Sequence, residues 1–268
     1  MADSYMLDNT PAEQARLSRQ ASVLRPVTER LFRAAGIGPG MSVLDVGCGV
    51  GDVSAIAAEL VGADGRVVGF DRDLRQVMAA AARFDDGAVA SFVQATIDDP
   101  PAGEFDAIVG RLVLMFQPDL FAAVSSLVRR LRPGGVVAFL ENNLRPDASE
   151  LITWPATPLV EQLRSWVARG ASGSVHHFVG LQLPSIFRQV GLVPHPPYES
   201  CAVIYEGHDC AEMTADIVCS LMPLLTAAGV NPSEIDVDTL AERLYVDGRD
   251  DRMCAHGPLI GVWARKPE

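Results

Sequence analysis

The sequence predicts an α/β protein built on a doubly wound, mostly parallel sheet of seven strands, with helical additions before and after it. Between residues 42 and 140, short apolar runs alternate with helical patterns, as in a parallel sheet covered on both faces. A glycine turn at residues 47–51 separates an apolar strand from a helix. The length of 268 residues and the hydrophobic share of 49% are sufficient for one large domain, or for one domain with a substantial insertion.

Residues 1–40 predict an N-terminal helical cover. Thr10-Pro11-Ala12-Glu13 has the pattern of a capping box with proline at the first helical position, so a helix is expected to begin there. Arg25-Pro26 is expected to interrupt this helix, because proline removes a backbone donor. A second helix is then predicted over residues 27–35, ended by Gly36.

Residues 41–145 form the predicted core of the protein. Each predicted strand is a short apolar run, and Arg132-Pro133-Gly134-Gly135 breaks the chain before the fifth strand. Asp73 and Gln76 have the spacing of a capping box for the second helix of this core. We expect strands near 42–46, 66–70, 89–94, 106–110 and 135–140, and helices near 52–61, 73–83 and 119–131.

Residues 146–268 are predicted to supply lid helices and the strands that complete the sheet. About fifty residues, 206–256, separate the last two strands, which is far longer than an ordinary loop. Together with 143–180, they are expected to form a helical lid that encloses a small substrate. The pattern predicts helices near 149–169, 181–190, 210–228 and 231–244, pieces of a sixth strand at 192–193 and 201–205, and a last strand at 258–265.

The charge, the cysteine pattern and the lengths of the apolar stretches limit which binding partners and which cell compartment are expected. The net charge of −12 disfavours a nucleic-acid partner, because phosphate binding needs a basic face. The five cysteines form no C-x-x-C pair, and the N-terminus lacks the basic and apolar regions of a signal peptide. No apolar stretch approaches 18 residues, so a membrane-spanning helix is not expected. We therefore expect a cytoplasmic protein that acts on a small molecule and does not associate with a membrane. A homodimer is compatible with these observations.

The spacing of the glycines indicates which ligand the turn binds. A dinucleotide fingerprint needs G-x-G-x-x-G, but Asp52 stands where its third glycine would be. The turn instead reads G-x-G-x-G behind Asp45, a carboxylate suited to a ligand that carries an ammonium or sulfonium group. Asp71 ends the next apolar run, about 20 residues after the turn, where a partner for ribose hydroxyls is expected.

These segments resemble the class I S-adenosylmethionine-dependent methyltransferases. V-L-D-V-G-C-G-V-G resembles the first motif of that family and G-F-D-R-D the second, while F-D-A-I-V-G-R-L-V-L and L-R-P-G-G-V-V-A-F resemble the segments around the fourth and fifth strands. The resemblance covers residues 1–145 well and the remainder loosely. It implies a Rossmann-like methyltransferase fold and S-adenosylmethionine as cofactor, with S-adenosylhomocysteine as product. The cofactor-binding residues that it implies in the two motifs are Asp45, Gly47, Cys48, Gly49, Asp71 and Arg72.

Further cofactor contacts follow from the same resemblance. Relatives commonly carry Gly-Asp-Ala after the third strand, whereas this chain has Ala95-Thr96-Ile97. Thr96 would face the adenine amino group, with Asp98 as a second candidate, and Ile97 would form an apolar wall. Arg111 and the backbone near Leu112 are expected beside the methionine part of the cofactor. In the N-terminal helix, Gln20 is favoured over Arg16 and Arg19 for the same region.

Methyl transfer to oxygen is helped by a general base, and histidine is the natural choice near neutral pH. His176 and His177 lie in the predicted cover, and at most one of them is expected to act. Glu141, at the end of the fifth strand, is the alternative base, and His256 is a weaker candidate. No metal-ligand spacing and no G-x-S-x-G nucleophile pattern is present.

The sequence therefore predicts methyl transfer from S-adenosylmethionine to a small molecule, with oxygen slightly favoured over nitrogen or carbon, in specialised metabolism. Three alternatives remain open: an NAD-dependent oxidoreductase, a cyclase or isomerase that retains the cofactor unchanged, and a protein that binds the cofactor without catalysis. Asp52 in place of the third glycine disfavours the first. Only product analysis separates the other two from a methyltransferase.

Overall fold

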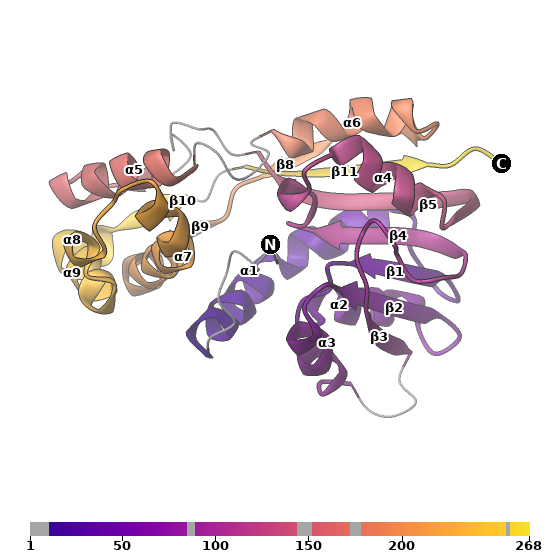
Figure 1. Ribbon diagram of the computed structural model, residues 1–268, viewed down its shortest axis with the longest axis horizontal. Helices are drawn as coiled ribbons and strands as arrows, with labels where there is room; N and C mark the ends of the chain where they lie inside the picture. The colour runs from indigo at the N-terminus through magenta and orange to yellow at the C-terminus, as the bar shows by residue number, and fades with distance from the viewer. Residues whose placement is uncertain (1–10, 85–88, 144–151, 172–177, 256–257) are drawn as a thin grey trace. The chain divides into compact units, whose positions relative to one another are not determined.

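The structure is a computed structural model that describes residues 11–84, 89–143, 152–171, 178–255 and 258–268 (Figure 1). The chain divides into two units. The larger unit comprises 24–143, 178–201 and 259–268, and the smaller comprises 1–23, 144–177 and 202–258. Each unit is described by itself.

The larger unit is built on one twisted sheet with the strand order β3-β2-β1-β4-β5-β11-β7, and β8 also pairs with β11. The first five of these strands are parallel, and β11 runs antiparallel to its neighbours. The expected doubly wound sheet is confirmed, and the short strands β7 and β8 share its seventh position, beside β11. The bounds are β1 Ser42–Val46, β2 Arg66–Asp71, β3 Ala90–Gln94, β4 Phe105–Arg111, β5 Leu131–Asn142, β7 Val193–Pro194, β8 Glu199–Cys201 and β11 Leu259–Arg265.

Helices cover both faces of this sheet. The helix α6 packs on β11 so closely that a Cβ built at Gly180 would lie 2.5 Å from Ile260, while a Cβ at Gly261 would lie 3.2 Å from Leu31 of α1. Because neighbouring residues of a strand point to opposite faces, α1 and α6 lie on opposite sides of the sheet. Figure 1 shows α4 beside α6. The helices are α1 Pro11–Ala35, α2 Asp52–Val61, α3 Leu74–Ala81, α4 Leu120–Val128 and α6 Val179–Gln189, with a short 3-10 helix, η1, at Leu114–Phe116.

The smaller unit is mainly helical and has its own apolar core. Val160, Leu163 and Trp166 of α5 pack there against Leu225 of α7 and Leu240 of α9. A three-stranded antiparallel sheet of order β6-β10-β9 completes this unit. Its elements are β6 Ile152–Trp154, α5 Pro158–Ala171, β9 Ile204–Glu206, α7 Gly207–Ala227, α8 Pro232–Ile235, α9 Val237–Gly248, the 3-10 helix η2 Arg249–Asp251 and β10 Met253–Ala255.

The expected interruption of the first helix at Pro26 is wrong. The helix α1 runs continuously through this proline, although an internal proline costs about 3 kcal/mol. Pro26 lies on the exposed side of the helix, whereas Leu24, Thr28 and Leu31 are buried. Burial of that apolar side offsets the local cost, which is a tertiary effect that the local pattern does not contain.

Two expectations for the C-terminal part are also corrected. Residues 231–244 form two helices, because Asp236 adopts a left-handed conformation (φ 48°) between α8 and α9. Residues 201–205 do not form one strand, since β8 ends at Cys201 and β9 pairs in the smaller sheet. The three-residue strands β6 and β10 were not predicted, because they are too short to show an alternating pattern.

In the described part of the chain, no single helix has the length and apolar composition needed to cross a membrane. The two segments of α7, Gly207–Cys219 and Leu221–Ala227, meet that test only together, and they are bent by 52°. Ala211, Ala215, Val218 and Leu225 of the same helix are buried in the core of the smaller unit.

Candidate functional site

The glycine turn follows β1 at the carboxyl end of the sheet. Gly47, Gly49 and Gly51 all have positive φ angles, of 62°, 53° and 89°, a region that side-chain-bearing residues seldom adopt. The Cys48 N–H donates to the Phe70 carbonyl at 2.9 Å, which ties the turn to β2. The helix α2 then begins at Asp52 without a side-chain cap from Gly51. The helix N-terminus therefore follows directly on bare backbone, as anion- and nucleotide-binding turns require.

Neighbouring side chains support the two ends of this turn and leave its middle open. A Cβ built at Gly47 would lie 2.5 Å from Val113 Cγ2, and one at Gly51 would lie 3.1 Å from the Phe84 ring. At Gly49, no atom of the described residues outside its chain neighbours lies within 4 Å of the corresponding position. The described part of the turn thus has an open place at Gly49, where a ligand can approach the backbone closely.

Asp71, the last residue of β2, accepts a hydrogen bond from the backbone at this open place. Its Oδ2 accepts from the Gly49 N–H at 3.1 Å and its Oδ1 from the Asp73 N–H at 3.0 Å. Burial raises the pKa of the Asp71 carboxyl, and these two backbone hydrogen bonds oppose that rise. Each carboxylate oxygen keeps a further lone pair, so the group can still accept hydrogen bonds from ligand hydroxyls.

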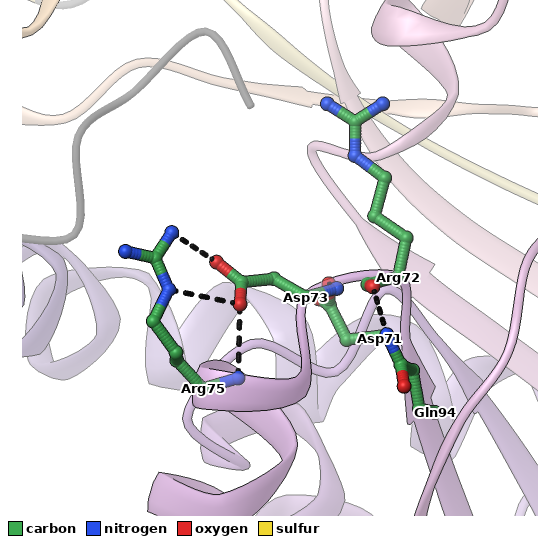
Figure 2. Close-up of polar contacts among 5 residues, drawn as sticks. All are labelled: Asp71, Arg72, Asp73, Arg75 and Gln94. Carbon is green, nitrogen blue, oxygen red and sulfur yellow. Dashed lines mark hydrogen bonds and ion pairs between the residues drawn. The ribbon is translucent and has the colours of Figure 1, made fainter. Parts of the chain in front are cut away.

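The residues after Asp71 shape the start of α3 (Figure 2). Asp73 caps the helix by accepting from the Arg75 N–H at 2.9 Å, and its side chain pairs with the Arg75 guanidinium, which lowers the pKa of Asp73. Gln94 Nε2 donates to the Arg72 carbonyl at 3.0 Å. Figure 2 shows the Arg72 side chain directed away from the Asp73–Arg75 pair, so Arg72 contributes its backbone to this network.

A buried polar cluster lies behind the turn. Asp45 is 1% exposed, its Oδ2 accepts from the Ser54 hydroxyl at 2.6 Å, and its Oδ1 has no partner among the described residues. Burial raises the pKa of Asp45 to about 7, while Ser54 and the positive charge of Arg111 oppose this rise. Arg111 donates to the Thr28 hydroxyl of α1 at 3.2 Å. Burial lowers the pKa of Arg111, and the charges of Asp52 and Asp45 oppose this change.

The residues expected near an adenine ring follow β3. The Ala95 N–H donates to the Asp71 carbonyl at 3.1 Å, which keeps this segment beside the end of β2. Thr96 is exposed, and its hydroxyl accepts from the Asp99 N–H at 3.3 Å, whereas Ile97 is buried. The exposed Thr96 hydroxyl and the apolar Ile97 therefore lie next to each other in sequence, at the same edge as Asp71.

Glu141 lies at the carboxyl end of β5 and contacts the segment after β4. It is fully buried, and its Oε1 accepts from the N–H groups of Val113 and Leu114 at 3.0 and 2.9 Å. Burial raises the pKa of Glu141 to about 7, against the effect of these hydrogen bonds. Leu112, immediately before, has a φ of 54°, which is uncommon for a leucine. Glu141 thus supports a strained backbone.

The structure does not place several of the predicted site residues beside the glycine turn. His176, His177 and His256 lie outside the described residues, as do the side chains of Arg16 and Arg19. Gln20 is half-buried and belongs to the smaller unit. No group of three His, Cys, Asp or Glu side chains among the described residues has the arrangement of a metal site.

Sequence reasoning missed three residues of the site. Thr28 and Ser54 hold Arg111 and Asp45, and Val113 covers Gly47. Thr28 and Ser54 lie outside the quoted motifs, and Val113, although it lies in the segment around the fourth strand, is an apolar residue that does not indicate a ligand contact by its type.

A separate cavity of about 360 Å³ lies near the amino ends of β1 and β4, where Met41, Asp106 and Arg265 are among its lining residues. The glycine turn follows the carboxyl end of β1, so this cavity is not part of the candidate site.

Comparison with known proteins agrees with this geometry. Residues 43–135 match a family model described as a methyltransferase domain. The nocamycin O-methyltransferase of Saccharothrix syringae is 36% identical over 147 residues, which cover 50% of this chain and 49% of that protein. The chain therefore spans about half the length of this curated relative, and a similar share of others that it matches.

Two solved structures show the same fold at low sequence identity. An S-adenosylmethionine-dependent methyltransferase from Mesorhizobium loti superposes with a TM-score of 0.51 at 20% identity, over 91% of this chain and 98% of that one. The [4+2]-cyclase SpnF superposes with a TM-score of 0.53 at 20% identity, over 90% and 81%. Residues 43–135 therefore match a methyltransferase domain, and the described fold is shared with solved S-adenosylmethionine-dependent methyltransferases.

Proposed function

We propose that the protein transfers a methyl group from S-adenosylmethionine to a small-molecule acceptor, with oxygen favoured over nitrogen or carbon. The observation that carries this proposal is the hydrogen bond between the Asp71 carboxylate and the Gly49 N–H, at the open middle of the glycine turn. A carboxylate with spare lone pairs beside bare backbone is suited to a nucleoside whose ribose hydroxyls donate hydrogen bonds.

The residues present fit this cofactor. Asp45 Oδ1 is a buried acceptor without a partner among the described residues, and the ammonium group of the methionine part would satisfy it. Arg111 lies close enough to Asp45 for their charges to interact, and its guanidinium would pair with the methionine carboxylate. Among the described residues outside its chain neighbours, no atom lies within 4 Å of a Cβ built at Gly49, which leaves room for a ligand on that side of the backbone.

The cofactor, when bound, supplies an electrophilic methyl carbon on its sulfonium. The protein has to orient that carbon toward the acceptor and exclude water. In this proposal Asp71 orients the ribose, Asp45 and Arg111 hold the methionine part, and Thr96 and Ile97 contact the adenine. Cys48, Arg72 and Leu112 contribute backbone atoms, and the cofactor contact expected of Gln20 stays a prediction.

The acceptor is proposed to be a small molecule of specialised metabolism. The name of the nocamycin relative, an O-methyltransferase, supports transfer to oxygen. The helical lid expected from the sequence stays a proposal; within the smaller unit, residues of α5, α7 and α9 share an apolar core. His176 or His177 is proposed as the base, with Glu141 as the alternative. A cytoplasmic location, the lack of nucleic-acid and membrane partners, and a homodimer stay predictions.

Binding and turnover test this proposal separately. Isothermal titration calorimetry is expected to show binding of S-adenosylhomocysteine and no binding of NAD. Incubation with S-adenosylmethionine and a panel of phenolic and hydroxylated acceptors, followed by mass spectrometry, is expected to yield a product that has gained one methyl group. Absence of S-adenosylhomocysteine binding would overturn the cofactor assignment.

The superposition with the cyclase SpnF favours a second candidate, a cofactor-binding cyclase or isomerase on the same fold. In that case the cofactor remains intact and the product has the mass of the substrate. Product mass therefore distinguishes the two candidates, since only methyl transfer adds a carbon to the acceptor and releases S-adenosylhomocysteine.

A further inference from the structure

The end of β5 is linked to the glycine turn by a short series of contacts inside the larger unit. Glu141 is 0% exposed, and its Oε1 accepts from the Val113 and Leu114 N–H groups at 3.0 and 2.9 Å. The Leu112 N–H donates to the Leu140 carbonyl at 3.0 Å. The backbone of 112–114 is therefore held from two consecutive residues of β5.

This support acts on a conformation that the chain would not adopt unaided. Leu112 has a φ of 54°, in the left-handed region where a Cβ crowds the backbone. Such a residue persists only where the surrounding structure holds it. The two N–H groups that donate to Glu141 belong to Val113 and Leu114, the two residues after Leu112. Their hydrogen bonds therefore restrain the backbone where it would otherwise relax from the strained conformation of Leu112.

The next contact reaches the cofactor site. Val113 Cγ2 lies 2.5 Å from the position of a Cβ at Gly47, and Val113 Cγ1 lies 3.1 Å from that of a Cβ at Gly110. The Val113 side chain therefore fills the space above two glycines, one in the turn and one in β4. A shift of the Val113 backbone would move this side chain against or away from the turn.

We infer that Glu141 is a positioning residue, which fixes the Leu112–Leu114 backbone and, through Val113, the conformation of the glycine turn that binds the cofactor. This inference rests on the proposed function and assigns Glu141 a role other than the base considered above. The carboxylate does not need to meet the acceptor in this role, which agrees with its complete burial.

Three variants test the inference with readouts other than turnover. Glu141→Leu removes the acceptor, so amide hydrogen exchange at Val113 and Leu114 is expected to accelerate about tenfold or more, and affinity for S-adenosylhomocysteine to fall about tenfold or more. Glu141→Gln keeps an acceptor oxygen and is expected to retain both properties. Leu112→Gly in the Glu141→Leu background is expected to recover affinity in part, because glycine tolerates the positive φ. Glu104→Gln, at an exposed position before β4, is the matched control.

The outcomes separate the roles. Unchanged exchange and affinity in Glu141→Leu would overturn the inference, as would a Glu141→Gln variant with normal exchange and affinity but lost turnover, which is the behaviour of a base. If Glu141→Leu does not fold by circular dichroism, Val113→Ala tests the second contact: reduced affinity supports the inference and unchanged affinity overturns it. Wild-type protein that does not bind S-adenosylhomocysteine overturns the proposed function as well, whereas normal wild-type binding with unaffected variants overturns this inference alone.

Discussion

Asp71 and Gly49, 22 residues apart, are joined by a 3.1 Å hydrogen bond from the glycine N–H to the aspartate Oδ2. The residue assigned to the ribose therefore also holds the glycine turn, so one hydrogen bond joins the two halves of the proposed nucleoside site. A site that is already ordered loses less conformational entropy when it binds.

Replacing Asp71 by alanine is expected to weaken S-adenosylhomocysteine binding by about 1–3 kcal/mol, because the ligand hydroxyls and the Gly49 N–H both lose an acceptor. Isothermal titration calorimetry measures this change. Asp64→Asn, at an exposed position before β2, is the control and should bind as the wild type does. Equal affinity of Asp71→Ala and wild type would mean that the second motif does not bind the ribose.

Alanine at Gly47 and at Gly49 should have different consequences. At Gly47 the added Cβ meets Val113, so overpacking is expected to lower the free energy of unfolding by about 1–3 kcal/mol in addition to the backbone cost. At Gly49 only the cost of the positive φ applies, about 1–2 kcal/mol, while the Cβ fills the ligand's space. Urea unfolding and calorimetry should therefore show the larger stability loss at Gly47 and the larger affinity loss at Gly49. The reverse order would contradict the open place at Gly49.

The stability of the protein should depend on the ionisation of Asp45. The pKa of this carboxyl rises from 3.8 to about 7 on folding because of burial, so between these values the folded state holds a proton that the unfolded state has released. This contribution is fully present below pH 3.8 and is lost as the pH rises through 7. Asp45→Asn should therefore show a smaller decline in the free energy of unfolding between pH 4.5 and 7.5 than the wild type. Parallel curves for the two proteins, by urea unfolding, would show that Asp45 is not the titrating group.

Thr28 is expected to act on the cofactor site through Arg111. Thr28→Val keeps the shape of the side chain but removes the hydroxyl that accepts from Arg111 at 3.2 Å. Loss of one hydrogen bond to a charged group is expected to weaken S-adenosylhomocysteine binding by about 1–2 kcal/mol. Decarboxylated S-adenosylhomocysteine, which lacks the group assigned to Arg111, should bind wild type and variant alike. A similar loss for both ligands would instead indicate a general effect on the fold.

Much of the larger unit could be predicted from the sequence. The apolar runs of β1, β2 and β4 are buried on both faces, so their hydrophobicity alone marks them as strands of a covered parallel sheet. The glycine turn could also be predicted, because the positive φ angles at residues 47, 49 and 51 favour glycine and so produce a G-x-G-x-G pattern in the sequence. The smaller unit was less predictable, since three-residue strands and the left-handed Asp236 leave little periodic signal.

The sheet, the glycine turn and its acidic neighbours could be predicted from the chain alone, because local periodicity and backbone requirements act over a few neighbouring residues. Three relationships become visible only in the folded protein: Pro26 stays within one helix, Thr28 supports Arg111, and Glu141 contacts the backbone after β4. The Glu141–Val113 contact spans 28 positions of the sequence and the Arg111–Thr28 contact spans 83, while the Pro26 helix depends on which of its sides is buried. Contacts between residues so far apart leave no local pattern in a single sequence.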